Sequence, residues 1–441
     1  MTEQRKNVLL VSFDDCISYW DQKTAYNEPL QTPNLDRICD QASVFRSAYC
    51  QAPICGPSRS SMLSGKAPHQ TGIFDNNVAL FDRVQPQEVW PATFKQNGYY
   101  CSSGGKVYHS NNGMLKGPIH RQLYSDRRKR FDGDMRIPKH LEIKSFGGHR
   151  KGWATTDPKD DVTYYDHQAA NSAIDFLQNY EGNAPFYREV GFYSPHGPHV
   201  TPARFKEMYD VNNFEMPPEW QDGFDHNDYA AEHMPENPLL KKGDKEWWRC
   251  SVRNYFSALS HGDFHLGRVW EALQASAHAN NTIVVILSDH GFHLGNRNLY
   301  RKTTLWEQVA RVPLIIYDPD AKQGQSIHDP VALLDVGPTI LDLVDLPAPD
   351  ADLPGRSLKP MLAGATEADR AVPTFYHDNA SIRKGDYRFI RYEDGSTQLY
   401  DIHQDYWQQH DLGPSHPAYA PMSAALEECC RSHGFEFNAT T

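Results

Sequence analysis

Residues 8–15, Val8-Leu9-Leu10-Val11-Ser12-Phe13-Asp14-Asp15, form an apolar run that ends in two adjacent acids. Its length suits a strand buried on both faces, and such strands are typical of parallel sheets covered by helices. A second run of the same character, residues 282–288, ends in Asp289 and His290. Because open parallel sheets bind ligands at the carboxyl ends of their strands, we expect both acidic ends to lie at one edge.

Three carboxylates at that edge, from Asp14, Asp15 and Asp289, would repel one another unless a cation neutralised them. Carboxylate oxygens are hard ligands that suit Ca²⁺ or Mg²⁺. Aspartate also caps helices that follow strands, and the residues leave this alternative open for each pair. Two pairs at equivalent strand ends favour a metal site.

The pentapeptide Cys55-Gly56-Pro57-Ser58-Arg59 places a cysteine at the start of a predicted short helix. Proline is common in the first turn of a helix. Free N–H groups and the positive end of the helix dipole favour an anion there, and Arg59 can add a bidentate contact to a tetrahedral oxyanion. A buried structural cysteine is the alternative interpretation of Cys55.

The run from Cys55 to Arg59, followed by Leu63-Ser64-Gly65, resembles the maturation signature of the formylglycine-dependent sulfatases, Cys-x-Pro-Ser-Arg and then Leu-Thr-Gly. The resemblance implies that a maturation enzyme oxidises Cys55 to formylglycine, whose hydrated aldehyde is the nucleophile. It also implies a divalent cation, with Ca²⁺ favoured over Mg²⁺ or Mn²⁺. The ligands implied for this cation are Asp14, Asp15, Asp289, His290 and the modified Cys55.

Sulfatases line the same pocket with a Gly-Lys-x-x-x-His element, a Pro-His element and a lysine after the late Asp-His pair. The matching residues here are Lys106, His109, His196 and Lys302. By this likeness Arg59, Lys106 and Lys302 neutralise the charge of a sulfate ester. His196 and Lys302 are the implied proton donors to the leaving oxygen, and His109 is the implied base that releases sulfate.

The position of a single histidine near a strand end is weak evidence for a catalytic role, because the chain has 21 histidines. Single histidines and lysines near a strand end are more often surface or packing residues than ligands. His199 and His293 lie in the same segments as the matched residues but have no firm counterpart in the sulfatase pattern.

Apolar strands alternate with helical stretches along most of the chain, which predicts an α/β protein with a mostly parallel sheet flanked by helices. Helices are expected from Thr32 onward, over 166–180 and over 253–275. The resemblance implies the alkaline phosphatase-like fold.

The pattern changes after residues 353–358, and residues 387–392 and 398–401 around the turn 393–396 predict a hairpin. We therefore expect a catalytic domain over 1–360 and a small C-terminal subdomain with an antiparallel sheet over 361–441.

A net charge of −12 argues against nonspecific binding to nucleic acid or to an anionic membrane surface.

No apolar run approaches the roughly 20 residues that cross a bilayer. The N-terminus passes directly into the first strand, without room for a secretory segment, so the sequence as written predicts a cytoplasmic protein. An exported form stays open if a signal peptide has been removed. The 8 cysteines show no regular spacing and are expected to be reduced thiols.

Residues 116–151 are locally basic. They predict either a solvated loop or a rim that holds a second anionic group, such as a uronate carboxylate or another sulfate. Residues 105–109, Pro195-His196 and 288–291 resemble the iduronate-2-sulfatase-like branch, which implies a sulfated sugar or oligosaccharide as substrate.

Two alternatives stay open. Phosphonate monoester and phosphodiester hydrolases share the cysteine motif, but they usually have glutamine after the first metal aspartate, where this chain has Asp15. The chain would instead be a non-catalytic anion-binding protein if Cys55 were never converted.

Overall fold

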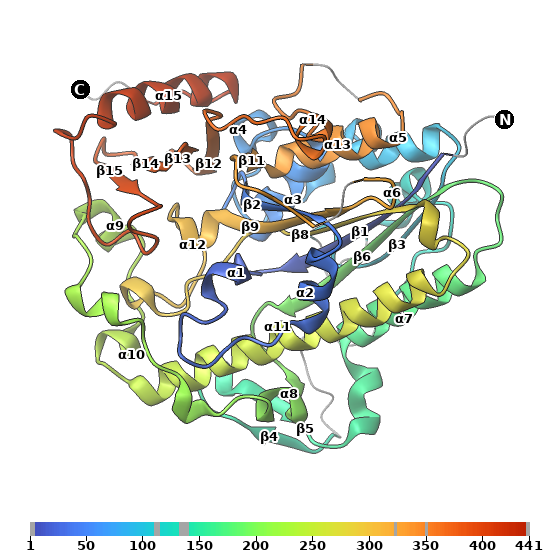
Figure 1. Ribbon diagram of the computed structural model, residues 1–441, viewed down its shortest axis with the longest axis horizontal. Coiled ribbons are helices and arrows are strands. Elements are labelled where there is room, and N and C mark those ends of the chain that lie inside the picture. The colour runs from blue at the N-terminus through green and yellow to red at the C-terminus, as the bar shows by residue number, and fades with distance from the viewer. Residues whose placement is uncertain (1–4, 110–114, 132–140, 322–323, 349–351, 438–441) are drawn as a thin grey trace.

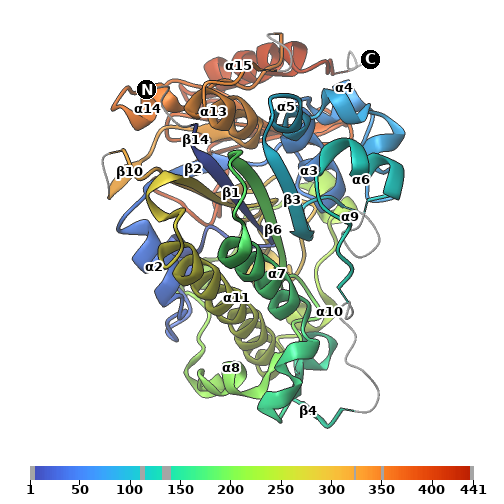
Figure 2. The same ribbon diagram turned by 90° about the vertical axis from the view of Figure 1, so that its right-hand side faces the viewer.

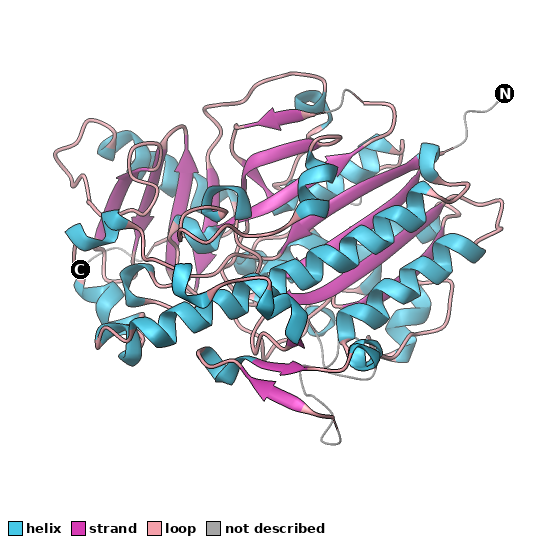
Figure 3. Ribbon diagram, turned by 60° about the horizontal axis from the view of Figure 1, so that its bottom comes forward, coloured by secondary structure: helices cyan, strands magenta, loops and turns pink. Residues whose placement is uncertain are grey.

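The computed structural model describes residues 5–109, 115–131, 141–321, 324–348 and 352–437. A central sheet has the strand order β10-β2-β9-β8-β1-β6-β3, and β11 pairs with β2 at one side. Figure 3 shows these strands side by side, with a second sheet at one end of the molecule. The central strands are β1 (Asn7–Asp14), β2 (Ser43–Tyr49), β3 (Tyr100–Gly105), β6 (Phe186–Pro195), β8 (Thr282–Ser288), β9 (Arg311–Tyr317), β10 (Gln325–Ile327) and β11 (Val331–Ala332).

Strand direction confirms the mostly parallel sheet that the apolar runs predict. β1 is parallel to both of its neighbours, β6 and β8, and β3 is parallel to β6. β9 is the exception, because it runs antiparallel to β8 and to β2. Phe13 of β1 pairs with Ser288 of β8, so Asp14 and Asp289 leave the sheet at the same edge.

Alternate residues of β1 pack into two separate cores, one on each face of the sheet. Val8 and Leu10 lie in the core shared with α3, α5 and α13. Leu9 and Val11 lie in the core shared with α2, α7 and α11. Figures 1 and 2 show the helices on both faces of the sheet. The helices of these two layers are α2 (Pro33–Cys39), α3 (Cys55–Ser64), α5 (Trp90–Gln96), α7 (Tyr165–Asn179), α11 (Lys245–Gln274) and α13 (Val336–Leu343).

The expected helices are present, but α11 starts earlier than its sequence pattern predicts. It begins at Lys245 because the side chain of Asp244 accepts a hydrogen bond from the backbone N–H of Trp247 at 2.9 Å and caps the first turn. Asp244 is an ordinary N-cap residue, but the apolar stripe that marks the helix in sequence starts later. The resulting 30-residue helix crosses the sheet and reaches the site.

The C-terminal region forms its own antiparallel sheet, β12-β13-β14-β15, covered by α15. The hairpin predicted from the sequence is confirmed as β14 and β15. Thr374 Oγ1 donates to the Cys50 carbonyl at 2.7 Å and joins this sheet to the first core. A domain boundary at residue 360 stays a prediction. The elements are β12 (Val372–Tyr376), β13 (Asn379–Lys384), β14 (Tyr387–Arg391), β15 (Thr397–Asp401) and α15 (Tyr419–Ser432).

The other helices are short and lie in the connections. They are α1 (Tyr19–Gln22), α4 (Pro68–Thr71), α6 (Gly117–Leu123), α8 (Ala203–Glu207), α9 (Asp228–His233), α10 (Pro238–Lys241), α12 (Glu307–Ala310) and α14 (Lys359–Leu362). Among the described residues, no helix has the length and apolar character needed to cross a membrane. None of the eight cysteines, all of which are described, forms a disulfide bond in this structure.

A glycine in the middle of α11 lets this helix approach the active-site ends of β1 and β6. A Cβ atom at Gly262 would lie 2.8 Å from Phe13 Cε1 and 2.8 Å from Ser194 Cβ. We expect Gly262→Ala to lower the free energy of unfolding by about 1–3 kcal/mol, because overpacking displaces the helix. Chemical denaturation measures this change.

Gly117→Ala at the open start of α6 is the matched control, since its nearest neighbour would be a flexible arginine tip at 3.6 Å. In an open helical position alanine stabilises by about 1 kcal/mol relative to glycine. A stabilised Gly262→Ala protein would contradict the close packing of α11 on the sheet.

Candidate active site

The chain turns sharply where β1 ends, and this turn brings two carboxylates to one point. Asp15 has a left-handed backbone, with φ of 63°. Its carbonyl accepts a hydrogen bond from Tyr255 Oη at 2.5 Å, and the same hydroxyl accepts from the N–H of Ile17 at 3.0 Å. Tyr255 of α11 therefore holds the turn in a conformation that most residues avoid.

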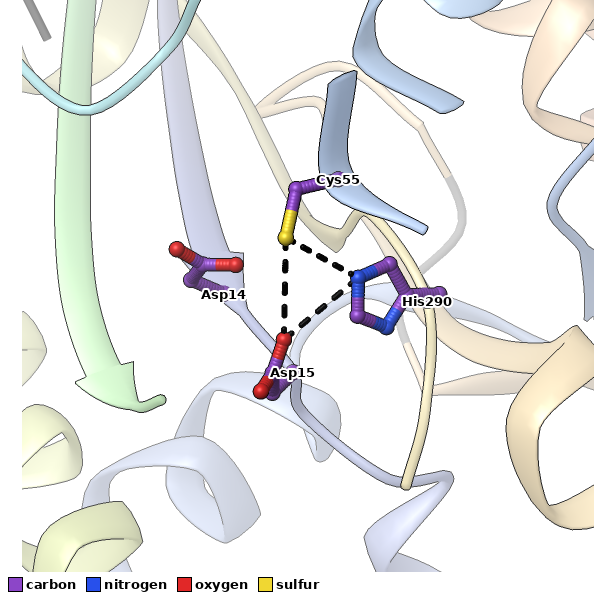
Figure 4. Close-up of side chains that lie close together, drawn as sticks. All are labelled: Asp14, Asp15, Cys55 and His290. Carbon is purple, nitrogen blue, oxygen red and sulfur yellow. Dashed lines mark hydrogen bonds and ion pairs between the residues drawn. The ribbon is translucent and has the colours of Figure 1, made fainter. Parts of the chain in front are cut away.

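Four side chains meet at this edge of the sheet, as Figure 4 shows. Ligand atoms of Asp14, Asp15, Cys55 and His290 all lie within 4.8 Å of one another, and all four residues are buried. His290 Nε2 is 3.3 Å from Cys55 Sγ and 3.4 Å from Asp15 Oδ1. The ends of β1 and β8 therefore place two acids and a histidine beside the cysteine.

Two lysines place positive charge directly on this cluster. Lys302 Nζ lies 2.9 Å from Cys55 Sγ and 2.7 Å from Asp15 Oδ1, and Lys106 forms an ion pair with Asp14. Burial opposes ionisation of the Cys55 thiol, but Lys302, Lys106 and His290 outweigh it and hold its pKa well below the usual value. Positive charge around a cysteine favours the thiolate over the thiol.

Arg59 faces the protein framework, which differs from the expected contact with a substrate oxyanion. Its Nε donates to Asp289 Oδ2 at 2.8 Å, and its side chain is 1% exposed. The other two nitrogens donate to Ser12 Oγ and to the carbonyls of residues 13, 106 and 107. In this structure Arg59 therefore ties α3 to the ends of the strands.

Asp289 lies next to the four-residue cluster, with both oxygens bonded to protein donors. Oδ1 accepts from the N–H groups of Asp15 and His290 at 3.1 and 3.0 Å, while Oδ2 accepts from Arg59. Burial raises the pKa of this carboxyl, against the opposing charge of Arg59. The role of Asp289 as a metal ligand stays a prediction.

Two of the predicted histidines lie beside the cluster. His196 is partly exposed, and its Nε2 is 3.9 Å from Asp15 Oδ2. His109 hydrogen-bonds to Cys55 and lowers the pKa of the thiol, whereas its buried Nδ1 has no partner among the described residues. Both histidines are partly buried, and they approach the cluster from different segments of the chain.

His293 and His199 belong to the supporting structure. His293 is fully buried and lies 2.9 Å from Asn296 Oδ1 and 2.7 Å from Thr304 Oγ1, so both ring nitrogens are used within the loop. His199 is packed edge-on against the Tyr255 ring, with ring centroids 5.5 Å apart. Neither ring reaches the cysteine cluster.

Sequence reasoning missed three residues that shape the site. Tyr255 supports the turn at Asp15, Asn76 accepts the N–H of Gly56 at 2.8 Å, and the Tyr193 ring lies 4.7 Å from Lys106 Nζ. Tyr193 could have been suspected, because it precedes Ser194-Pro195-His196 at a strand end. Tyr255 lies inside a long helix, where nothing in the pattern marks it.

The donor set fits a hard divalent cation. Asp14 Oδ1 is buried without a hydrogen-bond partner among the described residues, and such an oxygen is costly unless something positive lies opposite it. Carboxylate oxygens of Asp14 and Asp15 are the ligands that Ca²⁺ and Mg²⁺ prefer. His290 adds a nitrogen donor, which is less usual for hard cations.

Comparison with known proteins identifies the family. The sequence model of the sulfatase family matches residues 6–346, and that of the N-sulphoglucosamine sulphohydrolase C-terminal region matches residues 295–432. A sulfatase from Formosa agariphila is 32% identical over 425 residues, which cover 91% of this chain and 82% of the relative. Iduronate 2-sulfatase from Homo sapiens is 27% identical, covering 89% of this chain and 75% of the relative.

Solved structures show the same fold at lower identity. Phosphonate monoester hydrolase from Agrobacterium radiobacter has a TM-score of 0.74 and 19% identity, and the match covers 97% of this chain and 95% of the hydrolase. A protein solved with its substrate D-glucosamine-2-N,6-O-disulfate has a TM-score of 0.75 and 23% identity, with 98% of both chains covered. The fold is alkaline phosphatase-like, and with the family match and the cysteine cluster in place, the chain belongs to the sulfatase family.

Proposed function

We propose that this protein hydrolyses a sulfate ester on a sulfated sugar or oligosaccharide, and that Cys55 is converted to formylglycine for this reaction. The observation that carries the proposal is the position of Cys55 Sγ, which lies 2.9 Å from Lys302 Nζ inside a cluster with two aspartates and a histidine. Relatives named as iduronate 2-sulfatase and N-acetylglucosamine-6-O-sulfatase support a sugar sulfate as substrate.

Conversion of Cys55 replaces its thiol with an aldehyde, and the hydrated aldehyde supplies the nucleophile that attacks sulfur. Attack on a sulfate ester is opposed by the negative charge of the ester oxygens. Lys106 and Lys302 are already fixed at the cluster by Asp14 and Asp15, so they neutralise that charge without reorganising. A maturation enzyme that oxidises Cys55 is the partner that this proposal requires.

Two histidines near the cysteine are suited to moving protons. His196 is partly exposed and 3.9 Å from Asp15, so it can protonate the leaving oxygen of a sugar that enters from solvent. Lys302, whose Nζ lies 2.9 Å from Cys55 Sγ, is the second proposed proton donor to the leaving oxygen. His109 contacts Cys55 and has a free Nδ1 among the described residues, so it is the proposed base for release of sulfate.

A divalent cation, for which we favour Ca²⁺, is proposed to be held by Asp14, Asp15, His290 and Asp289 together with the converted Cys55. It supplies positive charge that polarises a sulfate oxygen. Asp14 Oδ1 supports this placement, because it is buried, accepts no hydrogen bond among the described residues and has Arg59 Nη2 only at 3.8 Å.

Arg59 is proposed as a positioning residue. It is buried, bonds to Asp289 and to the ends of β1 and β3, and has no exposed face for a substrate. Its contribution to catalysis would therefore act through Asp289 and Lys106.

The substrate class is tested with protein that has been matured with a formylglycine-generating enzyme. We expect it to release inorganic sulfate from sulfated mono- or oligosaccharides and to hydrolyse a phosphodiester more slowly. Peptide mass spectrometry should show Cys55 with its sulfur replaced by oxygen and two hydrogens lost. Cys55→Ala should release no sulfate.

Faster turnover of the phosphodiester would favour the phosphonate and phosphodiester hydrolases, which share the fold. Fully converted protein that releases no sulfate from a broad panel of sulfated saccharides would exclude the proposal.

The cation is tested by unfolding. After removal of metal with a chelator, we expect added Ca²⁺ to raise the unfolding temperature, since a ligand at 100 times its Kd stabilises a protein by about 2.7 kcal/mol. Asp15→Asn should abolish the shift, because asparagine keeps the left-handed backbone but loses the charge. Asp320→Asn, an exposed acid far from the cluster, is the control and should keep the shift. Equal shifts in both variants would argue against the site.

The positioning role of Arg59 is tested with two substitutions. Arg59→Met should lower the free energy of unfolding by about 3–5 kcal/mol, because it leaves Asp289 buried without its partner. Arg37→Met, which removes an exposed ion pair with Glu271, should change it by less than about 0.5 kcal/mol. Arg59→Lys keeps the charge but cannot make all of the bonds, so it should bind the cation more weakly. Wild-type cation affinity in Arg59→Lys would contradict the role.

A further inference from the structure

A short turn at residues 147–152 lies beside the loop that carries His196. It connects β4 (Ile143–Ser145) to β5 (Trp153–Thr155), and β5 is parallel to β7 (Thr201–Pro202). β7 follows the His196 loop directly along the chain. Figure 1 shows β4 and β5 below α8 and α11, apart from the central sheet. This small sheet therefore places the end of the basic segment beside the loop that carries His196.

The backbone of the turn is strained. Arg150 and Lys151 have φ of 48° and 66°, a left-handed conformation that is unfavourable for non-glycine residues. Glycines on either side also have positive φ, at positions 147, 148 and 152. Strain of this kind persists only where the surrounding structure enforces it, and it is found often at binding sites.

Helix α11 enforces the conformation. The Asn254 side chain donates to the Gly147 carbonyl at 2.8 Å, and Ser251 Oγ accepts the N–H of His149 at 2.8 Å. A Cβ atom at Gly148 would lie 2.6 Å from the Ser251 nitrogen, so the turn is in direct contact with the helix. The turn is thus a fixed platform rather than a free loop.

His149 connects this platform to the catalytic loop. Its ring lies 5.2 Å from the Tyr300 ring and 6.1 Å from the His199 ring, measured between centroids. A Cβ atom at Gly197 would lie 3.9 Å from His149 Nε2. Gly197 is the neighbour of His196, so the turn begins within side-chain reach of a proposed catalytic group.

Arg150 and Lys151 follow His149 and are exposed. Among the described residues neither forms an ion pair with an acid, and Lys151 Nζ lies 5.6 Å from the centroid of the Trp153 ring. Burial lowers the pKa of nearby His199, and the charged neighbours that lower it further, Arg150 among them, are all basic. A local positive region on a chain of net charge −12 is suited to an anion.

The other half of the basic segment is already engaged. Lys129 is paired with Asp126 at 3.3 Å and donates to Ser102 Oγ at 3.4 Å. Arg128 donates to the Leu115 carbonyl at 3.0 Å. These bonds hold residues 126–129 against β3 and leave fewer free donors there.

We propose that Arg150 and Lys151 form a second anion-binding subsite, which holds a carboxylate or sulfate on the sugar next to the sulfate ester that is cleaved. The inference rests on the proposed function. It predicts that the substrate is a saccharide with more than one negatively charged group. The turn fixes the backbone positions of both residues, so the segment that carries the two cations need not be ordered when the second anion binds.

The test compares three sulfated disaccharides that differ in one group on the neighbouring sugar: a carboxylate, a second sulfate, or the alcohol made by reducing the carboxylate. The double variant Arg150→Asn/Lys151→Asn removes both charges, and asparagine tolerates the left-handed backbone. We expect its kcat/KM to fall about 10-fold or more for the charged disaccharide that the subsite prefers, mostly through KM. Turnover of the alcohol form and of a small aryl sulfate should stay unchanged.

Arg127→Asn is the matched control, because it removes an exposed cation from the same basic segment on the β3 side. It should leave all three rates unchanged. Equal losses on the charged and uncharged disaccharides, no loss on either, or the same loss in Arg127→Asn would each overturn the subsite.

A binding measurement separates this inference from the proposed function. Calorimetry with Cys55→Ala protein should show weaker binding of the charged disaccharides when Arg150 and Lys151 are replaced. If the wild-type protein releases no sulfate but this difference is present, the proposed function fails and the subsite stands. Equal affinities, or no binding by Cys55→Ala protein, would overturn the subsite.

Discussion

The buried ion pair between Arg59 and Asp289 is the constraint on which the site depends. Arg59 comes from α3 and Asp289 follows β8, and the same guanidinium bonds to the carbonyls of Phe13 and Lys106 at the ends of β1 and β3. A charge in this environment is stable only when its partners are all in place. The pair therefore aligns the helix that begins at Cys55 with the strand ends that carry the acids.

Concentrated charge is the second property of the site. Acids, a thiol with a lowered pKa and two lysines lie in a region that is almost closed to water. Burial of such groups costs free energy, and the fold offsets the cost by pairing each charge with an opposite one. The same pairing orients the lysines before a substrate arrives, which is the condition for strong electrostatic stabilisation of a transition state.

Several features could be predicted from sequence because they depend on local patterns. The apolar run before Asp14 marks a buried strand, and Pro57 marks the start of the helix at Cys55. Others could not. The antiparallel direction of β9 has no signature in an apolar run, and the early start of α11 depends on a cap at Asp244. Arg59 was expected to meet an anion from solvent, but its depth in the fold turns it toward Asp289.

The sequence by itself determined the family, the cysteine motif and the two acidic strand ends, because each depends on a short run of neighbouring residues. Only the tertiary structure decided which groups meet. Cys55 and Lys302 are far apart along the chain, and their contact depends on how the loop after β8 folds over α3. Tyr255 supports Asp15 from the opposite layer of helices. Such contacts depend on how whole layers of helices pack on the sheet. A short stretch of sequence does not specify this packing, so the contacts could not be predicted from it.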